Sequence, residues 1–423
     1  MSLIKTSFYS SIYTVIRLLT GLISNKVVAV YVGPAGVALL GQFSNFTSIL
    51  LTVSTGGINV GVTKYISEYK NSTAKLNAIL NASCKITLWF AVPLSLFLFV
   101  AHEQLAVFVF KKTEYSNLFI IFAVMLILFA LNSLLMSILT GFKEVRKLTT
   151  ANIVGSIIGL FLTILFTMTM GLYGALLSMI VTQGVVFFVT LYFVIGSSWW
   201  KFDFIRQKID RQELAKLFKF SLMALTSAAT IPVSQMIIRN HLGTSISWDA
   251  AGYWQAMWRL SEIYLTFVTV SFSVYYVPRL SEIFAEHDLR KEILYGFKII
   301  MPIIGFGCLS VYVLKDFIIT VLFTEKFLPM RQLFAFQLVG DFFKITSWIL
   351  GNVVVAKAMT KTYIATEIFA TLNLLGMTFI CVHFFGLVGV TYAYTFCYIC
   401  HLTIFLIIFR KLLFSSGKTS YVT

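Results

Sequence analysis

The chain has 423 residues, of which 58% are hydrophobic and only 12% are charged, and its mean hydropathy is +0.88. A water-soluble domain is roughly 45–50% apolar and about 25% charged, so this composition excludes an ordinary soluble enzyme and indicates a polytopic membrane protein. In a soluble protein the net charge of +16 would suggest a nucleic-acid partner. In a membrane protein such a positive charge is expected mainly in the loops on one side of the membrane. We therefore expect no nucleic-acid partner.

Apolar runs of about 20 residues, the length of a membrane-crossing helix, occur twelve times. We therefore expect an all-α integral membrane protein, and the first span is expected to be retained because no cleavage site follows it. The apolar stretch from Phe317 to Phe323 is too short to cross and is expected to be interfacial. The expected spans are 7–31, 37–60, 77–101, 117–142, 151–170, 173–195, 217–240, 251–277, 293–314, 331–356, 362–384 and 387–409.

Lys and Arg are distributed unequally between the two sets of loops. Cytoplasmic loops carry an excess of these residues, so the richer set is assigned to the cytoplasm, together with the N- and C-termini. The poorer, outer set holds only Lys111, Lys112, Lys315, Lys326 and Arg331.

The two halves of the chain resemble each other at a nearly constant spacing. Gly171 and Gly174 precede the sixth span as Gly386 and Gly389 precede the twelfth, and three other matches lie at offsets of 214 to 216 residues. We expect a six-helix lobe at 1–196, a basic cytoplasmic linker at 197–216 and a second six-helix lobe at 217–423. Such parallel repeats place a substrate site between the lobes; the alternative is an old duplication that now serves only packing.

Polar side chains of several spans fall on one face of the helix, because successive residues are about 100° apart. Such a stripe lines either a hydrated cavity or a neighbouring helix, to which its side chains can hydrogen-bond. The amide residues expected to line a central lumen are Gln42, Asn45, Asn59, Gln255, Gln337 and Asn352.

Five ionisable residues lie deep within predicted spans, where each charge costs roughly 2.5–3.5 kcal/mol and usually marks a pathway. They are Arg17, Arg259, Glu262, Asp341 and Lys344. Arg259 with Glu262, and Asp341 with Lys344, are three residues apart, so pairing along one helix is the alternative. We expect Asp341 and Glu262 to couple transport to an ion or proton. Arg17, Arg259 and Lys344, with Arg239 nearer the outer boundary, are expected to attract an anion.

No residue pattern indicates catalysis, a metal or a cofactor. The haem-attachment string Cys397-Tyr398-Ile399-Cys400-His401 lies within a predicted span, and Gly417-Lys418-Thr419 lacks the upstream glycine, strand and helix of a phosphate-binding loop. An integral-membrane enzyme would need a sizeable loop domain or paired outer carboxylates, and the outer loops offer neither.

Several strings along the chain resemble the enterobacterial Wzx flippases of the multidrug/oligosaccharidyl-lipid/polysaccharide exporter superfamily. They are MSLIK at the start, VGPAG from Val32, GVTKYISEY from Gly61, KFSLMALTS from Lys219, SWDAAGYWQ from Ser247, SFSVYYVP from Ser271, LVGD from Leu338 and VVVAKA from Val353. These flippases carry undecaprenyl-pyrophosphate-linked oligosaccharides across the bacterial inner membrane.

The resemblance implies a V-shaped, MATE-like pair of lobes around a cationic lumen, working by alternating access. It implies an undecaprenyl-pyrophosphate-linked oligosaccharide as substrate, for example an O-antigen repeat unit, with membrane lipid around the protein. It also suggests a polysaccharide polymerase and a chain-length regulator as partners. The alternative on the same scaffold is a multidrug or cation antiporter, whose lumen should be acidic or aromatic rather than basic.

Overall fold

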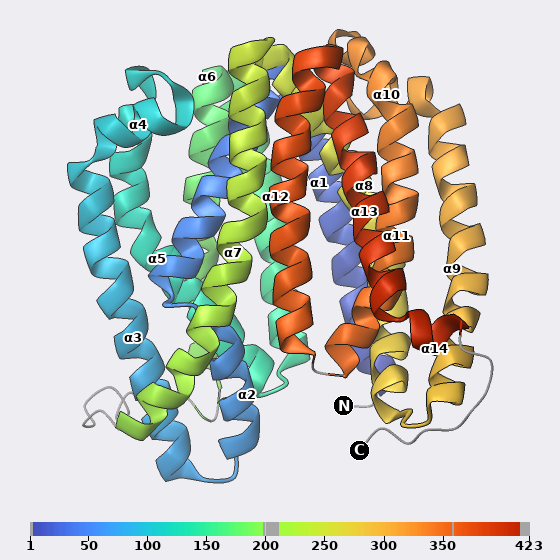
Figure 1. Cartoon of the computed structure of the whole chain (residues 1–423). Coiled ribbons are helices and arrows are strands. Elements are labelled where there is room, and N and C mark those ends of the chain that lie inside the picture. Colours follow the sequence, from blue (N-terminus) through green and yellow to red (C-terminus); the bar gives the residue numbers. More distant parts are fainter. Residues whose placement is uncertain (1–2, 198, 200–210, 358, 415–423) are drawn as a thin grey trace. The chain divides into compact units, whose positions relative to one another are not determined.

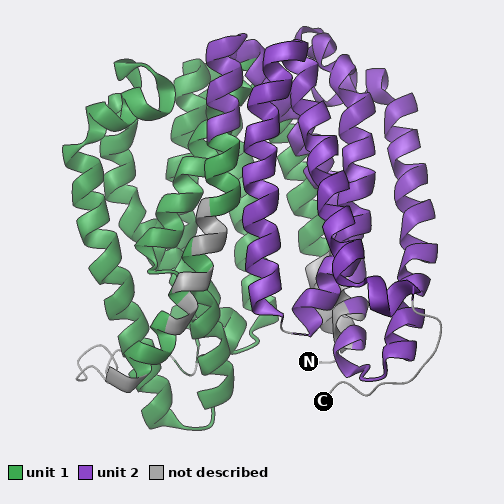
Figure 2. Ribbon diagram, in the orientation of Figure 1, with its two compact units in different colours: residues 1–236 green, residues 237–423 purple. Residues whose placement is uncertain are grey.

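The computed structural model describes residues 3–197, 199, 211–357 and 359–414, and every regular element within these ranges is helical (Figure 1). The chain divides into two compact units, Met1–Met236 and Ile237–Thr423 (Figure 2). The division falls within one helix, α7 (Arg211–Ser245). Residues 198 and 200–210 of the predicted basic linker lie outside the described residues.

The N-terminal unit packs its helices around α5 and the long pair α1 and α6. One part of its core is aliphatic and includes Ile58, Ile79 and Ile138. Another is aromatic, with the buried Phe43 and Phe119 rings edge to face at 6.0 Å. The elements are α1 (Leu3–Ser54), α2 (Asn59–Tyr69), α3 (Thr73–Val100), α4 (His102–Phe110), η1 (Thr113–Tyr115), α5 (Ser116–Gly141), α6 (Val145–Ile195) and the first part of α7.

The C-terminal unit is organised around α11, which packs against α8, α9 and α13. Most of the apolar stretch from Phe317 to Phe323, which is too short to cross a membrane, forms the short helix α10. The elements after α7 are α8 (Trp248–Glu282), α9 (Glu286–Val313), α10 (Lys315–Leu322), η3 (Glu325–Leu333), α11 (Phe334–Ala356), α12 (Thr360–Phe385), η4 (Gly386–Val388), α13 (Gly389–Ile408) and α14 (Arg410–Phe414).

Each predicted span lies largely on a helix, although the second, 37–60, runs past the end of α1 at Ser54 through a turn into α2. Seven helical segments of the described residues are long and apolar enough to cross a membrane. Three of them, Ile12–Ser54, Val145–Ile195 and Thr360–Ile408, each contain most or all of two predicted spans. At 1.5 Å per residue, straight helices of these lengths would measure about 65–77 Å, more than twice the roughly 30 Å hydrocarbon core. The remaining two spans lie on α7 and α8, which carry more polar residues. The chain is a multi-pass membrane protein.

Glycines mark the bends within the long segments. At Gly33 in α1 the backbone has φ 72° and ψ −173°, which interrupts the helix immediately before Pro34. A residue before proline is disfavoured in the α conformation, and glycine adopts positive φ without a Cβ clash. The predicted first and second spans are therefore joined by a sharp bend.

A matching bend occurs once in each unit. Gly171 has φ 58° and ψ −132°, and Gly386, 215 positions later, has φ 59° and ψ −141°. Three residues further on, a Cβ on Gly174 would lie 1.9 Å from the carbonyl oxygen of Phe166. A Cβ on Gly389 would lie 2.1 Å from the equivalent oxygen of its own unit. The same backbone geometry at both places agrees with the internal repeat that the sequence predicts.

Candidate functional site

The most extensive polar centre of the C-terminal unit surrounds Asp341 of α11, whose side chain is fully buried. Ser261 Oγ and Tyr264 OH, both on α8, donate hydrogen bonds to Oδ2, the first at 2.7 Å, and Tyr394 OH on α13 donates to Oδ1 at 2.7 Å. Gln337 Nε2 donates to Ser261 Oγ at 3.4 Å. Because a carboxylate removed from water needs hydrogen-bond donors, this centre ties α8, α11 and α13 together.

Lys344, three residues after Asp341, lies among aromatic rings. Its Nζ is 5.3 Å from the ring centroid of Trp258, 5.8 Å from that of Tyr394 and 5.4 Å from that of Tyr398. A cation in such contact gains about 2 kcal/mol or more when it is desolvated. Among the described side chains no salt bridge joins Lys344 to Asp341. Instead of pairing with each other, Asp341 accepts hydrogen bonds from hydroxyl groups and Lys344 contacts the faces of aromatic rings.

Arg239, at the C-terminal end of α7, is also fully buried. Gln255 Oε1 accepts hydrogen bonds from its Nε at 3.1 Å and from its Nη2 at 2.5 Å. The guanidinium carbon lies 5.7 Å from the ring centroid of Trp254, which is 5.6 Å from that of Trp258. Arg239 and Lys344 are thus the two ends of one row of contacts along α8.

Three of the predicted charged residues are exposed. Arg17 lies on α1, and Arg259 and Glu262 lie on α8. Glu262 Oε1 accepts a hydrogen bond from the indole nitrogen of Trp258 at 2.7 Å, which connects this exposed acid to the aromatic contacts of Lys344. Asn352 is buried and donates to a backbone carbonyl of its own helix at 2.9 Å.

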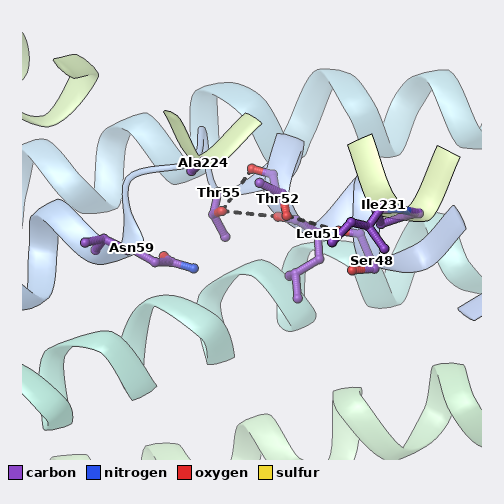
Figure 3. Close-up of a pocket in the computed structure, with 10 residues that line it drawn as sticks. Ser48, Leu51, Thr52, Thr55, Asn59, Ala224 and Ile231 are labelled. Carbon is purple, nitrogen blue, oxygen red and sulfur yellow. Dashed lines mark hydrogen bonds between the residues drawn. The ribbon is translucent and has the colours of Figure 1, made fainter. Parts of the chain in front are cut away.

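The N-terminal unit has a pocket of about 510 Å³ formed by α1, α7 and the start of α2 (Figure 3). Ser48, Thr52, Thr55 and Asn59 contribute hydroxyl and amide groups to its wall, and Ile231 contributes apolar surface. The Thr55 hydroxyl donates to the Thr52 carbonyl at 3.1 Å, one of the contacts drawn in Figure 3. Part of the polar stripe of the predicted second span therefore lines a cavity.

The other part of that stripe contacts α7. Asn45 Nδ2 donates to Gln235 Oε1 at 2.8 Å and to the Pro232 carbonyl at 3.4 Å. Gln42, one turn before Asn45, is 4% exposed. The amides at these two positions therefore lie largely within the helix packing of the N-terminal unit.

Sequence reasoning missed the hydroxyl and aromatic partners of the charged residues. Ser261 and Tyr264 are three residues apart, and Tyr394 and Tyr398 are four apart, so each pair shares a helix face. Hydropathy treats Trp258 and these tyrosines as part of an apolar span. The signal available in the sequence was the recurrence of tyrosine at helical spacing. That these tyrosines face the span with the acid and the lysine depends on helix packing.

Lys216, which lies outside the predicted spans, contacts Tyr69 at the C-terminal end of α2. Its Nζ donates to Glu213 Oε1 at 2.6 Å and to Tyr69 OH at 2.9 Å, and lies 5.4 Å from the Tyr69 ring centroid. The hydrogen bond to Glu213, followed by that to Tyr69, raises the pKa of Lys216 above its ordinary value. The residues before the predicted seventh span are therefore anchored to the N-terminal unit.

The fold is shared with solved transporter structures. An inward-facing multidrug resistance MATE family transporter of the MOP superfamily superposes with a TM-score of 0.73 at 16% identity, covering 96% of this chain and 100% of the other. An outward-facing multidrug resistance MATE family transporter of that superfamily gives a TM-score of 0.69 at 16% identity, covering 97% of this chain and 95% of the other. At this identity the likeness establishes the fold alone, and it confirms the predicted MATE-like, all-helical architecture.

Sequence comparison extends along nearly the whole chain. The lipid III flippases of Escherichia coli (strain K12) and of Shigella flexneri are each 32% identical over 406 residues, which is 96% of this chain and 97% of the relative. The family described as polysaccharide biosynthesis protein matches residues 3–284. Together with the MATE-like fold and the charged residues within its helices, these matches show that the chain belongs to the polysaccharide biosynthesis protein family.

Proposed function

We propose that this protein is an inner-membrane flippase for an undecaprenyl-pyrophosphate-linked oligosaccharide, such as an O-antigen repeat unit. The substrate moves from the cytoplasmic to the periplasmic leaflet. The observation that carries this proposal is the 32% identity to lipid III flippases along 96% of the chain. Membership of the polysaccharide biosynthesis protein family supports a saccharide-bearing substrate and a transporter rather than an enzyme.

The proposed transport cycle is alternating access between two lobes, residues 1–196 and 217–423, joined by the linker 197–216. Support comes from the repeated bends at Gly171 and Gly386, because transporters with internal repeats rock one repeat against the other around a fixed site. The excess of Lys and Arg on one set of loops supports a cytoplasmic location for both termini.

In this proposal the pyrophosphate is received by Arg17 and Arg259, with Lys344 and Arg239 completing a positively charged lumen. Arg17 and Arg259 are the exposed members, so they meet the substrate first, and guanidinium groups bind phosphate through paired, charge-assisted hydrogen bonds. Lys344 is half-buried and Arg239 enclosed. These two contribute mainly positive potential and hold α7, α8 and α11 in register.

Asp341 and Glu262 are the proposed coupling groups for a proton or another cation. An ionised carboxylate only accepts hydrogen bonds, whereas a protonated one must also donate. Protonation of Asp341 would therefore require Tyr394, Ser261 or Tyr264 to turn its hydroxyl. Because these hydroxyls lie on α13 and α8, the change alters the ties between helices. Glu262 is exposed, so in this proposal it binds and releases its proton or cation directly from and to the aqueous phase.

The remaining polar walls are assigned to Gln42, Asn45, Asn59, Gln255, Gln337 and Asn352, among which Asn59 lines the pocket of the N-terminal unit. The Asn59 amide would bind a sugar hydroxyl while the polyprenyl chain stays in lipid. The other five amides are buried or hydrogen-bonded within the helix packing. No cofactor is needed for this transfer. A polysaccharide polymerase and a chain-length regulator are the proposed partners, since another enzyme must join the flipped repeat units into a polymer.

The test is flipping of a pyrophosphate-linked oligosaccharide by the full chain reconstituted in vesicles. Arg17→Gln and Arg259→Gln should each slow flipping about tenfold or more, because a hydrogen bond to a charged group contributes about 1.5–3 kcal/mol and each 1.4 kcal/mol is a factor of ten. Lys26→Gln is the matched control, since Lys26 lies nine residues after Arg17 on α1, about 180° around the helix at 100° per residue. Unchanged flipping in both arginine variants would contradict the proposed site.

The same vesicles discriminate the alternative multidrug antiporter. Extrusion of cationic drugs by the native chain, without flipping of the lipid-linked oligosaccharide, would favour it. The likeness to multidrug transporters is at 16% identity, which supports a common fold, and a basic set of membrane-embedded residues is unsuited to cationic drugs.

A further inference from the structure

A second pocket lies in the C-terminal unit between α8 and α9, away from the Asp341 centre. Its volume is about 270 Å³, far above the roughly 10–15 Å³ that one water needs. In Figure 1 α9 forms the outer edge of its unit. The pocket is lined by Phe272 and Tyr276 of α8 and by Glu292, Tyr295, Gly296 and Ile299 of α9.

Two polar atoms at this pocket have no hydrogen-bond partner among the described residues. Tyr276 is 2% exposed and its hydroxyl oxygen is unpartnered, as is the solvent-shielded Oε1 of Glu292. An unpaired buried polar atom destabilises the folded chain, and it does so more strongly when it is charged. Around Tyr276 the packing is close, since a Cβ on Gly296 would lie 3.0 Å from its hydroxyl. The carboxylate and the phenol therefore form a preformed receptor for a hydrogen-bond donor.

A positive charge lies beside this receptor on its solvent side. Arg279 Nε is 3.7 Å from Glu292 Oε2, a long contact, and the Arg279 side chain is 47% exposed whereas that of Glu292 is 13% exposed. The negative group is thus enclosed and the positive group lies outside it. A zwitterionic ligand fits this arrangement of charges when its cationic end points inward to Glu292 and its anionic end points outward to Arg279.

The pocket also lies at a suitable depth. Tyr276 is six residues before the end of α8 at Glu282, and Glu292 is six residues after the start of α9 at Glu286. Six helical residues span about 9 Å. A headgroup layer is roughly 5–7 Å thick on each side of a roughly 30 Å hydrocarbon core. With the ends of α8 and α9 at the water side of that layer, Tyr276 and Glu292 would lie near the boundary of headgroups and acyl chains.

We propose that this pocket binds the headgroup of an ethanolamine phospholipid. The primary ammonium donates to Glu292 Oε1 and Tyr276 OH, and the phosphate accepts from Arg279. The half-buried Phe272 and the exposed Tyr295 border the first acyl carbons. A choline headgroup carries no N–H and would leave both receptor atoms unpaired, so the site discriminates between these two zwitterionic lipids. This inference is independent of the flipped substrate.

The test is native mass spectrometry of the full chain, purified in detergent and titrated with dioleoylphosphatidylethanolamine or dioleoylphosphatidylcholine. The ethanolamine lipid should bind about tenfold tighter, the factor expected for one hydrogen bond to a charged group. Glu292→Gln should remove this preference and Tyr276→Phe should reduce it. Glu286→Gln, at an exposed acid in the first turn of α9, should leave it unchanged.

A folding control accompanies the variants. Because the Tyr276 hydroxyl has no hydrogen-bond partner among the side chains that the structure describes, Tyr276→Phe should keep the thermal midpoint of the native chain in lipid-free detergent. Only its gain on adding the ethanolamine lipid should shrink. Equal binding of both lipids, or an unchanged preference in Glu292→Gln, overturns the proposal. Stabilisation by sodium chloride without lipid, lost in Glu292→Gln, would assign the pocket to an inorganic cation and overturn it as well.

Discussion

Replacing Tyr394 by Phe tests whether the hydroxyl donors hold the Asp341 centre together. The substitution removes the 2.7 Å hydrogen bond to Oδ1 but keeps the ring, whose centroid lies 5.6 Å from that of Trp258 and 5.8 Å from Lys344 Nζ. Among the described residues Tyr394 is the one donor to Oδ1, whereas Oδ2 accepts from two hydroxyls. The loss at Oδ1 is therefore uncompensated.

Two magnitudes bound the expected effect. Side-chain hydrogen bonds within membrane proteins average about 0.6 kcal/mol and reach about 1.7 kcal/mol, while bonds to charged groups contribute about 1.5–3 kcal/mol. Because Asp341 is a fully buried acceptor, we take the part of the range for charged groups that also lies within the range measured in membrane proteins. We expect Tyr394→Phe to lower the free energy of unfolding by about 1.5–1.7 kcal/mol, and Ser261→Ala to lower it less, because Tyr264 still donates to Oδ2.

The measurement is reversible unfolding of the full chain in mixed micelles, with Tyr392→Phe as control. Tyr392 lies on the same helix and contacts Phe336 and Phe385 through its ring, so loss of its hydroxyl should be neutral. In an Asp341→Asn background the effect of Tyr394→Phe should change by at least about 0.5 kcal/mol, as for directly interacting residues. Equal stability of the two single tyrosine variants, or the same cost in both backgrounds, would refute the reasoning.

Other substitutions test the α12–α13 bend and the α1–α7 contact. Gly389→Ala places a Cβ 2.1 Å from the Cys381 carbonyl oxygen and should destabilise by about 1–3 kcal/mol, as overpacking does. Gly376→Ala, with nothing within 4 Å of the new Cβ, should not, and equal thermal midpoints would contradict the steric account. Asn45→Leu should cost up to about 1.7 kcal/mol by unpairing Gln235. A second change, Gln235→Leu, should recover part of that loss, and additive costs in the unfolding free energy would show that the two amides do not interact.

The membrane-crossing helices could be predicted from the sequence because hydropathy reports a length requirement that the bilayer imposes on each segment separately. The bends at Gly33 and Gly386 were predictable as boundaries between spans, since glycine permits positive φ and Pro34 disfavours a continuous helix. The extent of α7 beyond its predicted span was not, because its additional turns depend on contacts such as that of Lys216 with Tyr69.

The site was predictable in its charged residues and not in their partners. Asp341 and Lys344 stand out because charge within a span is costly. Their spacing suggested a pair, yet Tyr394 and Ser261 supply hydrogen bonds from α13 and α8, and which helices adjoin α11 depends on tertiary packing. Trp258 shows the same limit, since its indole both contacts the Lys344 cation and donates to an acid four residues away.

The structure separates the charged residues by exposure, and this separation predicts which variants affect transport alone. A buried ionic group requires fixed partners, and Arg239 and Asp341 have them in Gln255 and in three hydroxyls, so neutralising either should lower both stability and transport. Arg17 and Arg259 are exposed and carry no comparable burial cost. If they receive the pyrophosphate, their neutral variants should fold as the native chain does and fail only when the substrate is presented.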